Sequence, residues 1–297
     1  MLAKPIASTP DLIRPYIRLT KPKVVMLLVF TAIVGMLLAS PSLPSWEIVL
    51  FGSLGIGLAS GAAAVINHVV DSRIDAVMAR TRGRPLPSGD VDAVRALAFG
   101  AIIGVAGLGM LWTMVNPLTA ILTFISLIGY AVIYTMFLKR ATPQNIVIGG
   151  AAGAAPPILG WTAVTGDLHA GALQLFLIIF IWTPPHFWAL ALQRKAEYAR
   201  AQIPMLPVTH GDEFTRLNIL LYTILLVAVT LLPFATGESG LVYLIGACVL
   251  NGWFFYHALC LYRSRDNARW AMPTFVASIN YLMYLFALLL IDHYVQF

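Results

Sequence analysis

The sequence contains nine apolar runs of about 17–22 residues, separated by short polar connections. A helix of about 20 apolar residues crosses the roughly 30 Å hydrocarbon core of a bilayer. Apolar residues make up 59% of the chain and charged residues 11%, too few to cover a soluble globule. The pattern therefore predicts an all-α membrane protein with nine transmembrane helices. The runs lie at about 24–40, 48–66, 94–113, 118–137, 146–164, 173–192, 218–235, 241–262 and 273–291.

The charged residues indicate how these spans are oriented. All 19 lysines and arginines fall before the first span or in the connections after the second, fourth, sixth and eighth. Basic connections stay in the cytoplasm, so we expect the N-terminus inside and Phe297 outside. The charged residues of the opposite connections are all acidic: Glu47, Asp167, Glu238 and Asp292.

This topology predicts a cytoplasmic N-terminal segment (1–23), a single transmembrane domain (24–291) and a short extracytoplasmic tail (292–297). The net charge of +6 follows from the basic connections, so no nucleic-acid partner is expected. The first 23 residues hold no apolar run, and we expect no cleaved signal peptide. A bacterial inner (plasma) membrane is the expected location.

Asn67, Asp71 and Asp75 lie four residues apart where the second apolar run ends. On a helix such residues share one face. Two carboxylates there repel each other and, near a helix C-terminus, oppose the macrodipole. Mg²⁺ is commonly held by one or two carboxylates plus substrate phosphates, so this motif predicts a Mg²⁺ site. The basic residues that follow are the expected phosphate partners: Arg80, Arg82 and Arg84.

A second polar stretch accompanies the sixth apolar run. Pro184 and Pro185 are expected to break or kink that span. His186 comes next, inside the span, where a polar residue is costly and a functional candidate. A hydrogen bond to a carbonyl freed by the prolines would instead make it structural, and both interpretations remain open. For Lys195 and Glu197, in the following connection, a solvated boundary pair is the simplest interpretation.

The two polar connections are similar to each other at an offset of about 120 residues. RPLPSG (84–89) corresponds to PMLPVTHG (204–211), and Asn67 corresponds to His186. A parallel repeat of four helices with one extra span fits this pattern. Such a repeat would bring both connections over one cavity.

Carboxylates suited to Mg²⁺, basic residues beside them and a membrane-embedded cavity together indicate a lipid diphosphate substrate. The cation would neutralise pyrophosphate as it leaves. The apolar cavity would hold an isoprenoid tail and keep water away from an allylic cation. The residues therefore predict a prenyl transfer reaction.

The motif NxxxDxxxD (67–75), followed by RTxxRPLxxG (80–89), resembles the first signature of the UbiA-type intramembrane prenyltransferases. Their fold of nine transmembrane helices matches the number of apolar runs. Over roughly residues 15–290 the chain is more closely similar to the haem-farnesylating branch of that family. Two positions differ from the residues usual in this branch. Glu197 stands before Tyr198 where the branch usually has Asp, and Gly83 stands where it often has Asn. The segments that carry this resemblance are GGAAGAAPPILGW (149–161), TPPHFWALAL (183–192) and EYARAQIPMLPV (197–208).

The resemblance implies transfer of a farnesyl group from farnesyl diphosphate to a vinyl group of haem B (protohaem IX). Addition of water then gives haem O, with release of pyrophosphate. The implied partners are farnesyl diphosphate, haem B and the lipid bilayer. Haem A synthase or a haem–copper oxidase assembly is the implied recipient of the product.

The resemblance also implies residue roles. The carboxylate motif is catalytic and binds Mg²⁺, and basic side chains bind the diphosphate. His186 is assigned to haem, because Phe187 and Trp188 beside it offer aromatic surfaces to a porphyrin. The expected site residues are Asn67, Asp71 and Asp75 for the metal, Arg80, Arg82, Arg84, Lys139 and Lys195 for the diphosphate, His186 and Trp188 for haem, and Glu197 and Tyr198 for the second motif.

Two alternatives come from different classes. One is a prenyltransferase acting on a quinone precursor or chlorophyllide, which the His186-containing second motif argues against. The other is a membrane transporter, since buried polar residues also mark ion pathways. A transporter would carry ionisable groups near the middle of several spans, whereas these charges cluster at one face.

Overall fold

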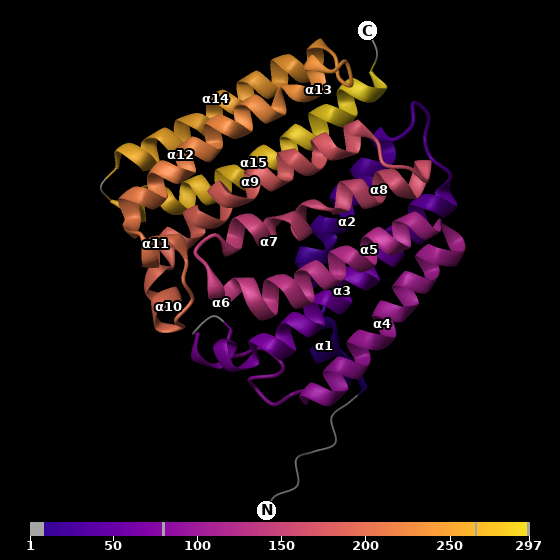
Figure 1. Ribbon diagram of the computed structural model, residues 1–297, viewed down its shortest axis with the longest axis vertical. Helices are drawn as coiled ribbons and strands as arrows, with labels where there is room; N and C mark the ends of the chain where they lie inside the picture. Colours follow the sequence, from indigo (N-terminus) through magenta and orange to yellow (C-terminus); the bar gives the residue numbers. More distant parts are fainter. Residues whose placement is uncertain (1–8, 79–80, 265, 296–297) are drawn as a thin grey trace, which may run out of the picture.

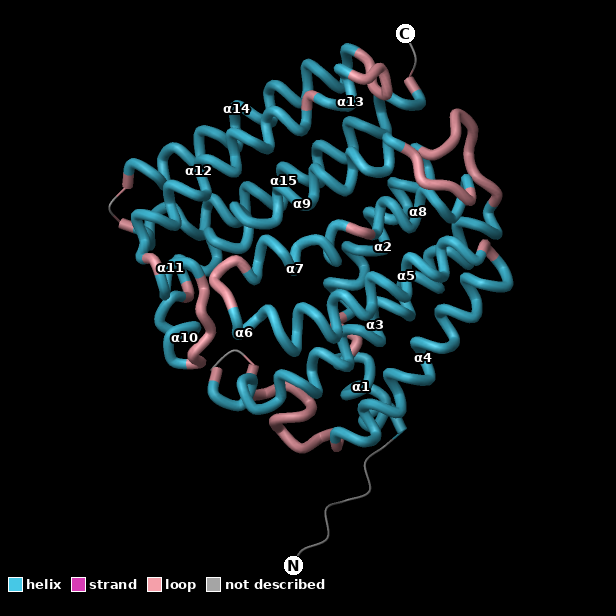
Figure 2. Tube along the Cα trace, viewed as in Figure 1, coloured by secondary structure: helices cyan, strands magenta, loops and turns pink. Residues whose placement is uncertain are grey.

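The computed structural model describes residues 9–78, 81–264 and 266–295, and within them the chain forms helices and turns only. Figures 1 and 2 show the long helices running side by side in one bundle. The helices are α1 (Thr9–Leu19), α2 (Pro22–Leu38), α3 (Trp46–Val77), α4 (Ala93–Met114), α5 (Pro117–Ile128), the π-helix η1 (Gly129–Leu138), α6 (Lys139–Ala141), α7 (Asn145–Ala154), α8 (Pro156–Thr165), α9 (Ala170–Gln193), α10 (Lys195–Arg200), α11 (Leu206–Thr209), α12 (Gly211–Thr230), α13 (Leu232–Ala235), α14 (Leu241–Arg263) and α15 (Asn267–Tyr294).

The predicted membrane fold is confirmed within the described residues. Eight segments are long and apolar enough to cross a membrane, and the bent pair Ile13–Leu19 and Pro22–Leu38 makes a ninth if it counts as one span. The bend of 52° lies between α1 and α2, so the segment predicted before the first span is itself partly helical. Each of the nine apolar runs lies on one of these spans.

The fourth span changes helix type partway. α5 passes directly into η1, in which the Thr135 hydroxyl donates to the carbonyl of Tyr130, five residues earlier (2.8 Å). A π-helix is rare and is found frequently at functional sites, because its wider turn alters which side chains share a face. Here η1 ends next to Lys139, and both Thr135 and Lys139 contact polar side chains of α3.

Pro184 and Pro185 do not break the span, since α9 runs from Ala170 to Gln193 without interruption; the alternative of a kink stays a prediction. Proline leaves carbonyls without their usual partners. Membrane bundles tolerate it because neighbouring helices and Ser or Thr side chains satisfy the backbone. In α9 the prolines leave the carbonyls of Phe180 and Ile181 without their N–H donors; the Thr183 hydroxyl donates to a different carbonyl, that of Ile179 (2.7 Å).

Glycine allows α2 and α8 to cross at backbone contact. A Cβ atom on Gly160 would lie 1.9 Å from the carbonyl oxygen of Ala32. A Cβ on Gly35 would lie 2.3 Å from the carbonyl oxygen of Pro157. Small residues permit such close approach in membrane helices, where packing replaces the hydrophobic effect as the driving force. This crossing fixes α2, which carries residues of the candidate site.

The polar connections gather at one end of the bundle. Figure 1 shows α1, α6, α10, α11 and the turns after α3 at the same end. The α2–α3 connection and the end of α15 lie at the opposite end. The two connections that were similar in sequence are therefore at the same end.

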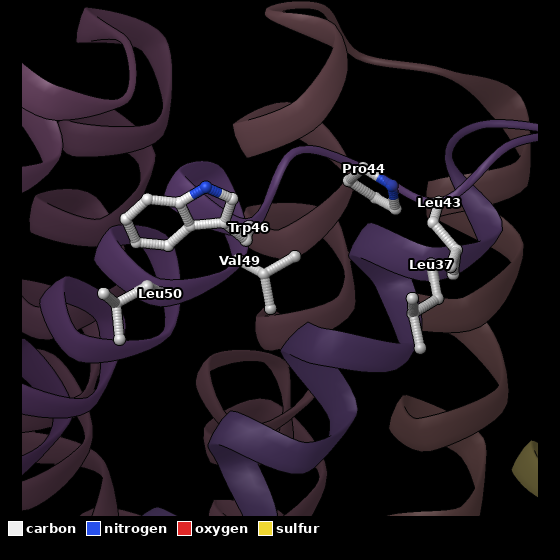
Figure 3. A pocket seen from close by; sticks show the side chains of 6 residues that line it. All are labelled: Leu37, Leu43, Pro44, Trp46, Val49 and Leu50. Atoms are coloured by element: carbon white, nitrogen blue, oxygen red, sulfur yellow. The ribbon is translucent and has the colours of Figure 1, made fainter.

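A shallow hollow at the α2–α3 connection contains apolar side chains only (Figure 3). Trp46 is 68% exposed there, as expected for an aromatic residue at a membrane–water interface. Nothing in this lining carries chemistry, so we assign no site to it. The lining residues are Leu37, Leu43, Pro44, Trp46, Val49 and Leu50.

Candidate active site

α3 presents Asn67, Asp71 and Asp75 inside the protein, each no more than 3% exposed. The helix continues well past its apolar run, to Val77, and so carries the whole motif. The Asn67 amide donates to Asp71 Oδ2 (2.9 Å) and to Thr135 Oγ1 (3.2 Å). The hydrogen bond between positions i and i+4 places these two side chains together on one face, as the spacing predicted.

Three basic side chains from other segments neutralise this motif. Lys139 Nζ lies 2.5 Å from Asp71 Oδ2, and an Arg84 guanidinium nitrogen lies 2.7 Å from Asp75 Oδ2. Lys21 Nζ donates to Asn67 Oδ1 (2.5 Å). In the sequence alone, the paired carboxylates indicate a bound cation. The structure shows that the protein's own cations offset their repulsion, so charge alone does not require a metal.

One oxygen of the motif still lacks a partner. Asp71 Oδ1 is buried and accepts no hydrogen bond from the described residues. Leaving a buried acceptor unsatisfied costs about 1–3 kcal/mol, and a hard cation would satisfy it. In the described part of the chain, no group of three or more His, Cys, Asp or Glu side chains is arranged to hold a metal ion by itself. The residues therefore fit a Mg²⁺ ion whose remaining ligands come from substrate phosphates or water.

The turns after α3 hold Arg84 against the motif. Thr81 Oγ1 donates to the Asp75 carbonyl (3.0 Å), and Arg18 donates to the Gly83 carbonyl (2.7 Å). Arg84 therefore lies in a loop and not on a helix. Of the other predicted phosphate partners, Arg80 lies outside the described residues and Arg82 is exposed.

Sequence reasoning missed Lys21 and the side chains of η1. Lys21 was counted only for topology, although it directly precedes the proline that starts α2 and has a left-handed backbone (φ 52°). The rings of Tyr130 and Tyr134 stack at 5.6 Å. Thr135 on η1 accepts a hydrogen bond from the Asn67 amide (3.2 Å). No spacing in the sequence indicates this contact, because it depends on the π-helix.

The structure does not bring Lys195 to the carboxylate motif. Its Nζ lies 2.8 Å from Asp212 Oδ1, and the other oxygen of Asp212 accepts from Asn267 (2.8 Å). Glu197 pairs with Arg194 at 3.7 Å, and its second oxygen is buried without a hydrogen-bond partner among the described residues. Tyr198 packs against the apolar cluster around Trp188. The boundary pairs are therefore Lys195–Asp212 and Arg194–Glu197, not Lys195–Glu197.

His186, on α9, is buried against α15. Its Nδ1 lies 2.7 Å from Ser278 Oγ, so its partner is a hydroxyl and not a carbonyl freed by the prolines. The aromatic surfaces stacked on its ring are Trp182 and Phe275. Trp188, expected beside it, is fully buried against Tyr222 instead. Two helical positions turn the chain by about 200°, which directs Trp188 to another face of α9.

A small pocket of about 120 Å³ lies beside His186, between α2, α9 and α15. Leu27 and Met283, on its rim, are 39% and 46% exposed, so it opens on the outer surface of the bundle. Leu27 lies six positions after Lys21, about 9 Å along the helix axis. The start of α2 therefore links the two features, because Lys21 contacts Asn67 of the motif and Leu27 lines the pocket. The other lining residues are Phe30, Thr31, Trp182, His186, Phe275, Ile279, Leu282 and Phe286.

Residues 28–279 match the sequence model of the UbiA prenyltransferase family. The chain belongs to this family. Membership confirms the resemblance drawn from the motifs and argues against the transporter alternative. It also agrees with a site in which carboxylates, basic residues and an apolar pocket lie together inside a helical membrane protein.

Relatives within the UbiA family share most of the chain. A protein of Marinobacter nauticus named protoheme IX farnesyltransferase is 60% identical over 282 residues, covering 95% of this chain and 93% of its own length. A protein of the same name from Teredinibacter turnerae is 62% identical over 282 residues, covering 95% and 90%.

Solved structures of distant UbiA-type proteins share the fold. A digeranylgeranylglyceryl phosphate synthase superposes with a TM-score of 0.82 at 19% identity, covering 96% of this chain and all of the other. A UbiA homolog from Archaeoglobus fulgidus bound to GPP and Mg²⁺ superposes with a TM-score of 0.63 at 16% identity, covering 93% and 99%. At these identities the likeness concerns the fold alone.

Proposed function

We propose that this chain transfers the farnesyl group of farnesyl diphosphate to a vinyl group of haem B. Water is added, and haem O and pyrophosphate are released. The observation that carries the proposal is the pair of sites in one helical bundle: a carboxylate–cation cluster on α3, which Lys21 contacts at the start of α2, and a His-bearing aromatic pocket that α2 also lines. The names of relatives about 60% identical support the same reaction. Haem A synthase or a haem–copper oxidase assembly is the proposed recipient of the product.

The carboxylate motif would hold Mg²⁺ through Asp71, Asp75 and Asn67. When bound, the ion neutralises charge that develops on the departing pyrophosphate. Lys139 and Arg84 hold the carboxylates in the substrate-free site. Both are placed to bind diphosphate oxygens, and Arg84 has the planar geometry for two parallel hydrogen bonds.

The bond changes balance without an oxidant or reductant. The C1–O bond of farnesyl diphosphate breaks, and pyrophosphate leaves with the electron pair. The vinyl π electrons form the new bond to C1 and leave a cation on the porphyrin side chain. Water adds to that cation and loses a proton, leaving a hydroxyl. The buried position of the site keeps water from reaching the farnesyl cation first.

The test is pigment formation by membranes that contain the protein, supplied with haem B, farnesyl diphosphate and Mg²⁺. We expect a new haem whose mass has increased by one farnesyl group and one water. Chelation of the divalent metal should abolish the product, and added Mg²⁺ should restore it. A prenylated quinone precursor or chlorophyllide in place of the new haem, when these acceptors are also supplied, would contradict the proposal.

We further propose that the end bearing the carboxylate motif faces the cytoplasm of a bacterial cell, in its inner membrane. A reporter active only outside the cytoplasm should be active when fused after Phe297 and inactive when inserted at Gly89, in the turns after α3. Basic residues resist translocation, which is the physical reason for this orientation. If both reporters were active, or both inactive, the number of spans between Gly89 and Phe297 would be even, which would contradict the proposed topology.

The contacts of the two lysines predict different effects of their removal. Lys139→Met should weaken binding of a farnesyl diphosphate analogue by at least about tenfold, because a buried cation beside the carboxylates is lost. Lys195→Met is the matched control: its partner Asp212 is half-exposed, and such a pair contributes less than about 1 kcal/mol. Isothermal titration of both variants with the analogue and Mg²⁺ distinguishes them. Equal losses would mean that Lys195 also reaches the diphosphate.

A further inference from the structure

The imidazole of His186 is fixed in plane and position. Trp182 stacks on it with ring centroids 4.2 Å apart and planes 20° apart, and Phe275 stacks at 4.5 Å and 27°. The indole nitrogen of Trp182 donates to the carbonyl of Ser278 (2.8 Å). The ring therefore cannot tilt without displacing an aromatic neighbour that is itself tied to α15.

Ser278 decides which ring nitrogen of His186 carries the proton. Its hydroxyl donates to the carbonyl of Phe275 (2.6 Å). A serine has one hydroxyl proton, so toward His186 Nδ1, 2.7 Å away, its oxygen acts as acceptor. Nδ1 is then the protonated nitrogen, and Nε2 keeps its lone pair.

The lone pair on His186 Nε2 accepts no hydrogen bond from the described residues. The His186 side chain lines the pocket between α2, α9 and α15. Thr31 is the other polar residue among those that line the pocket, and its hydroxyl already donates to the Leu28 carbonyl (2.9 Å). A ligand in this pocket therefore meets a neutral imidazole nitrogen surrounded by apolar and aromatic side chains.

We propose that His186 binds the iron of the acceptor haem through Nε2, and that Ser278 is the positioning residue that fixes the tautomer. Neutral imidazole is the commonest metal ligand in proteins, and ligating histidines usually donate their other nitrogen to a fixed acceptor. At about 120 Å³ the pocket is smaller than a porphyrin, but it opens on the bundle surface at Leu27 and Met283, so the ring would lie across its mouth, on the bilayer side. The assignment rests on the proposed function, since it takes haem as the acceptor.

The test is titration of the purified full-length protein with haem B, followed by its absorption spectrum and electron paramagnetic resonance. The wild type should show a nitrogen axial ligand. His186→Gly should lose that signature, and added imidazole should restore it. Ser278→Ala should lower haem affinity by about 10–100-fold, the usual effect of losing an outer-shell partner. Ser278→Thr, which keeps the hydroxyl, should recover most of it.

Two controls keep the inference separate from the proposed function and from simple misfolding. His257→Ala removes a half-buried histidine that does not line the pocket, and it should leave the haem spectrum unchanged. Mg²⁺-dependent binding of a farnesyl diphosphate analogue should survive in all variants.

Haem bound with an unchanged spectrum in His186→Gly would overturn the ligand assignment alone. Equal losses of haem and analogue in Ser278→Ala would overturn its positioning role. Absence of haem binding by the wild type would overturn the proposed function.

Discussion

Asp71→Asn is expected to lower kcat for haem farnesylation by at least about 100-fold, the scale on which single charge-stabilising groups act. The amide keeps the size of the side chain but removes the negative charge of the Asp71 carboxylate. In the wild type one oxygen of that carboxylate pairs with Lys139 and the other, Oδ1, is buried without a partner among the described residues. The site then loses affinity for a divalent cation, and Lys139 is left without a counter-charge. The measurement is turnover at saturating farnesyl diphosphate, with thermal unfolding to show that the fold is retained.

Asp212→Asn is the matched control for this substitution. Asp212 also accepts from a lysine, Lys195, but in the second polar connection and half-exposed. Loss of an exposed pair changes stability by less than about 1 kcal/mol, and kcat should stay within about twofold of the wild type. Near-normal turnover of Asp71→Asn would remove the metal-site interpretation. A loss in Asp212→Asn as large as that in Asp71→Asn would show that the assay reports folding.

Gly160→Val is expected to destabilise the protein by more than about 3 kcal/mol, above the usual range for an overpacked core. The added Cβ would lie 1.9 Å from the carbonyl oxygen of Ala32 and 2.7 Å from its carbon. Both are backbone atoms of α2, so no side-chain rotation relieves the clash and α2 must move. Activity should fall as well, because α2 follows directly on Lys21 and forms one wall of the His186 pocket. The midpoint of thermal unfolding in detergent measures the effect.

Gly153→Ala tests the addition of a Cβ to a helical glycine without the clash. Gly153 lies in α7 with nothing within 4 Å of the position of a Cβ. Alanine is favoured over glycine in a helix by about 1 kcal/mol, so the unfolding midpoint should rise slightly or stay constant. If Gly160→Val unfolded at the same temperature as Gly153→Ala, the backbone contact between α2 and α8 would not limit stability.

The sequence by itself determined the number of spans and the face that carries the carboxylates. Bilayer thickness sets the length of an apolar run, and helical periodicity places residues four apart on one side. Both are local properties, so Asn67 and Asp71 are in contact as their spacing predicted. The family resemblance was equally local, because it rested on short motifs that remain together along the chain.

Only the tertiary structure decided what surrounds those residues. Lys21, Arg84 and Lys139 come from three separate segments, and their contacts with the motif depend on the bend before α2, the turns after α3 and the π-helix η1. Proline propensity predicted a break in α9, but packing between neighbouring helices outweighs the loss of local hydrogen bonds. The partner of His186 is Ser278, 92 positions away. Pairings across the bundle follow from how helices pack, which no single stretch of sequence encodes.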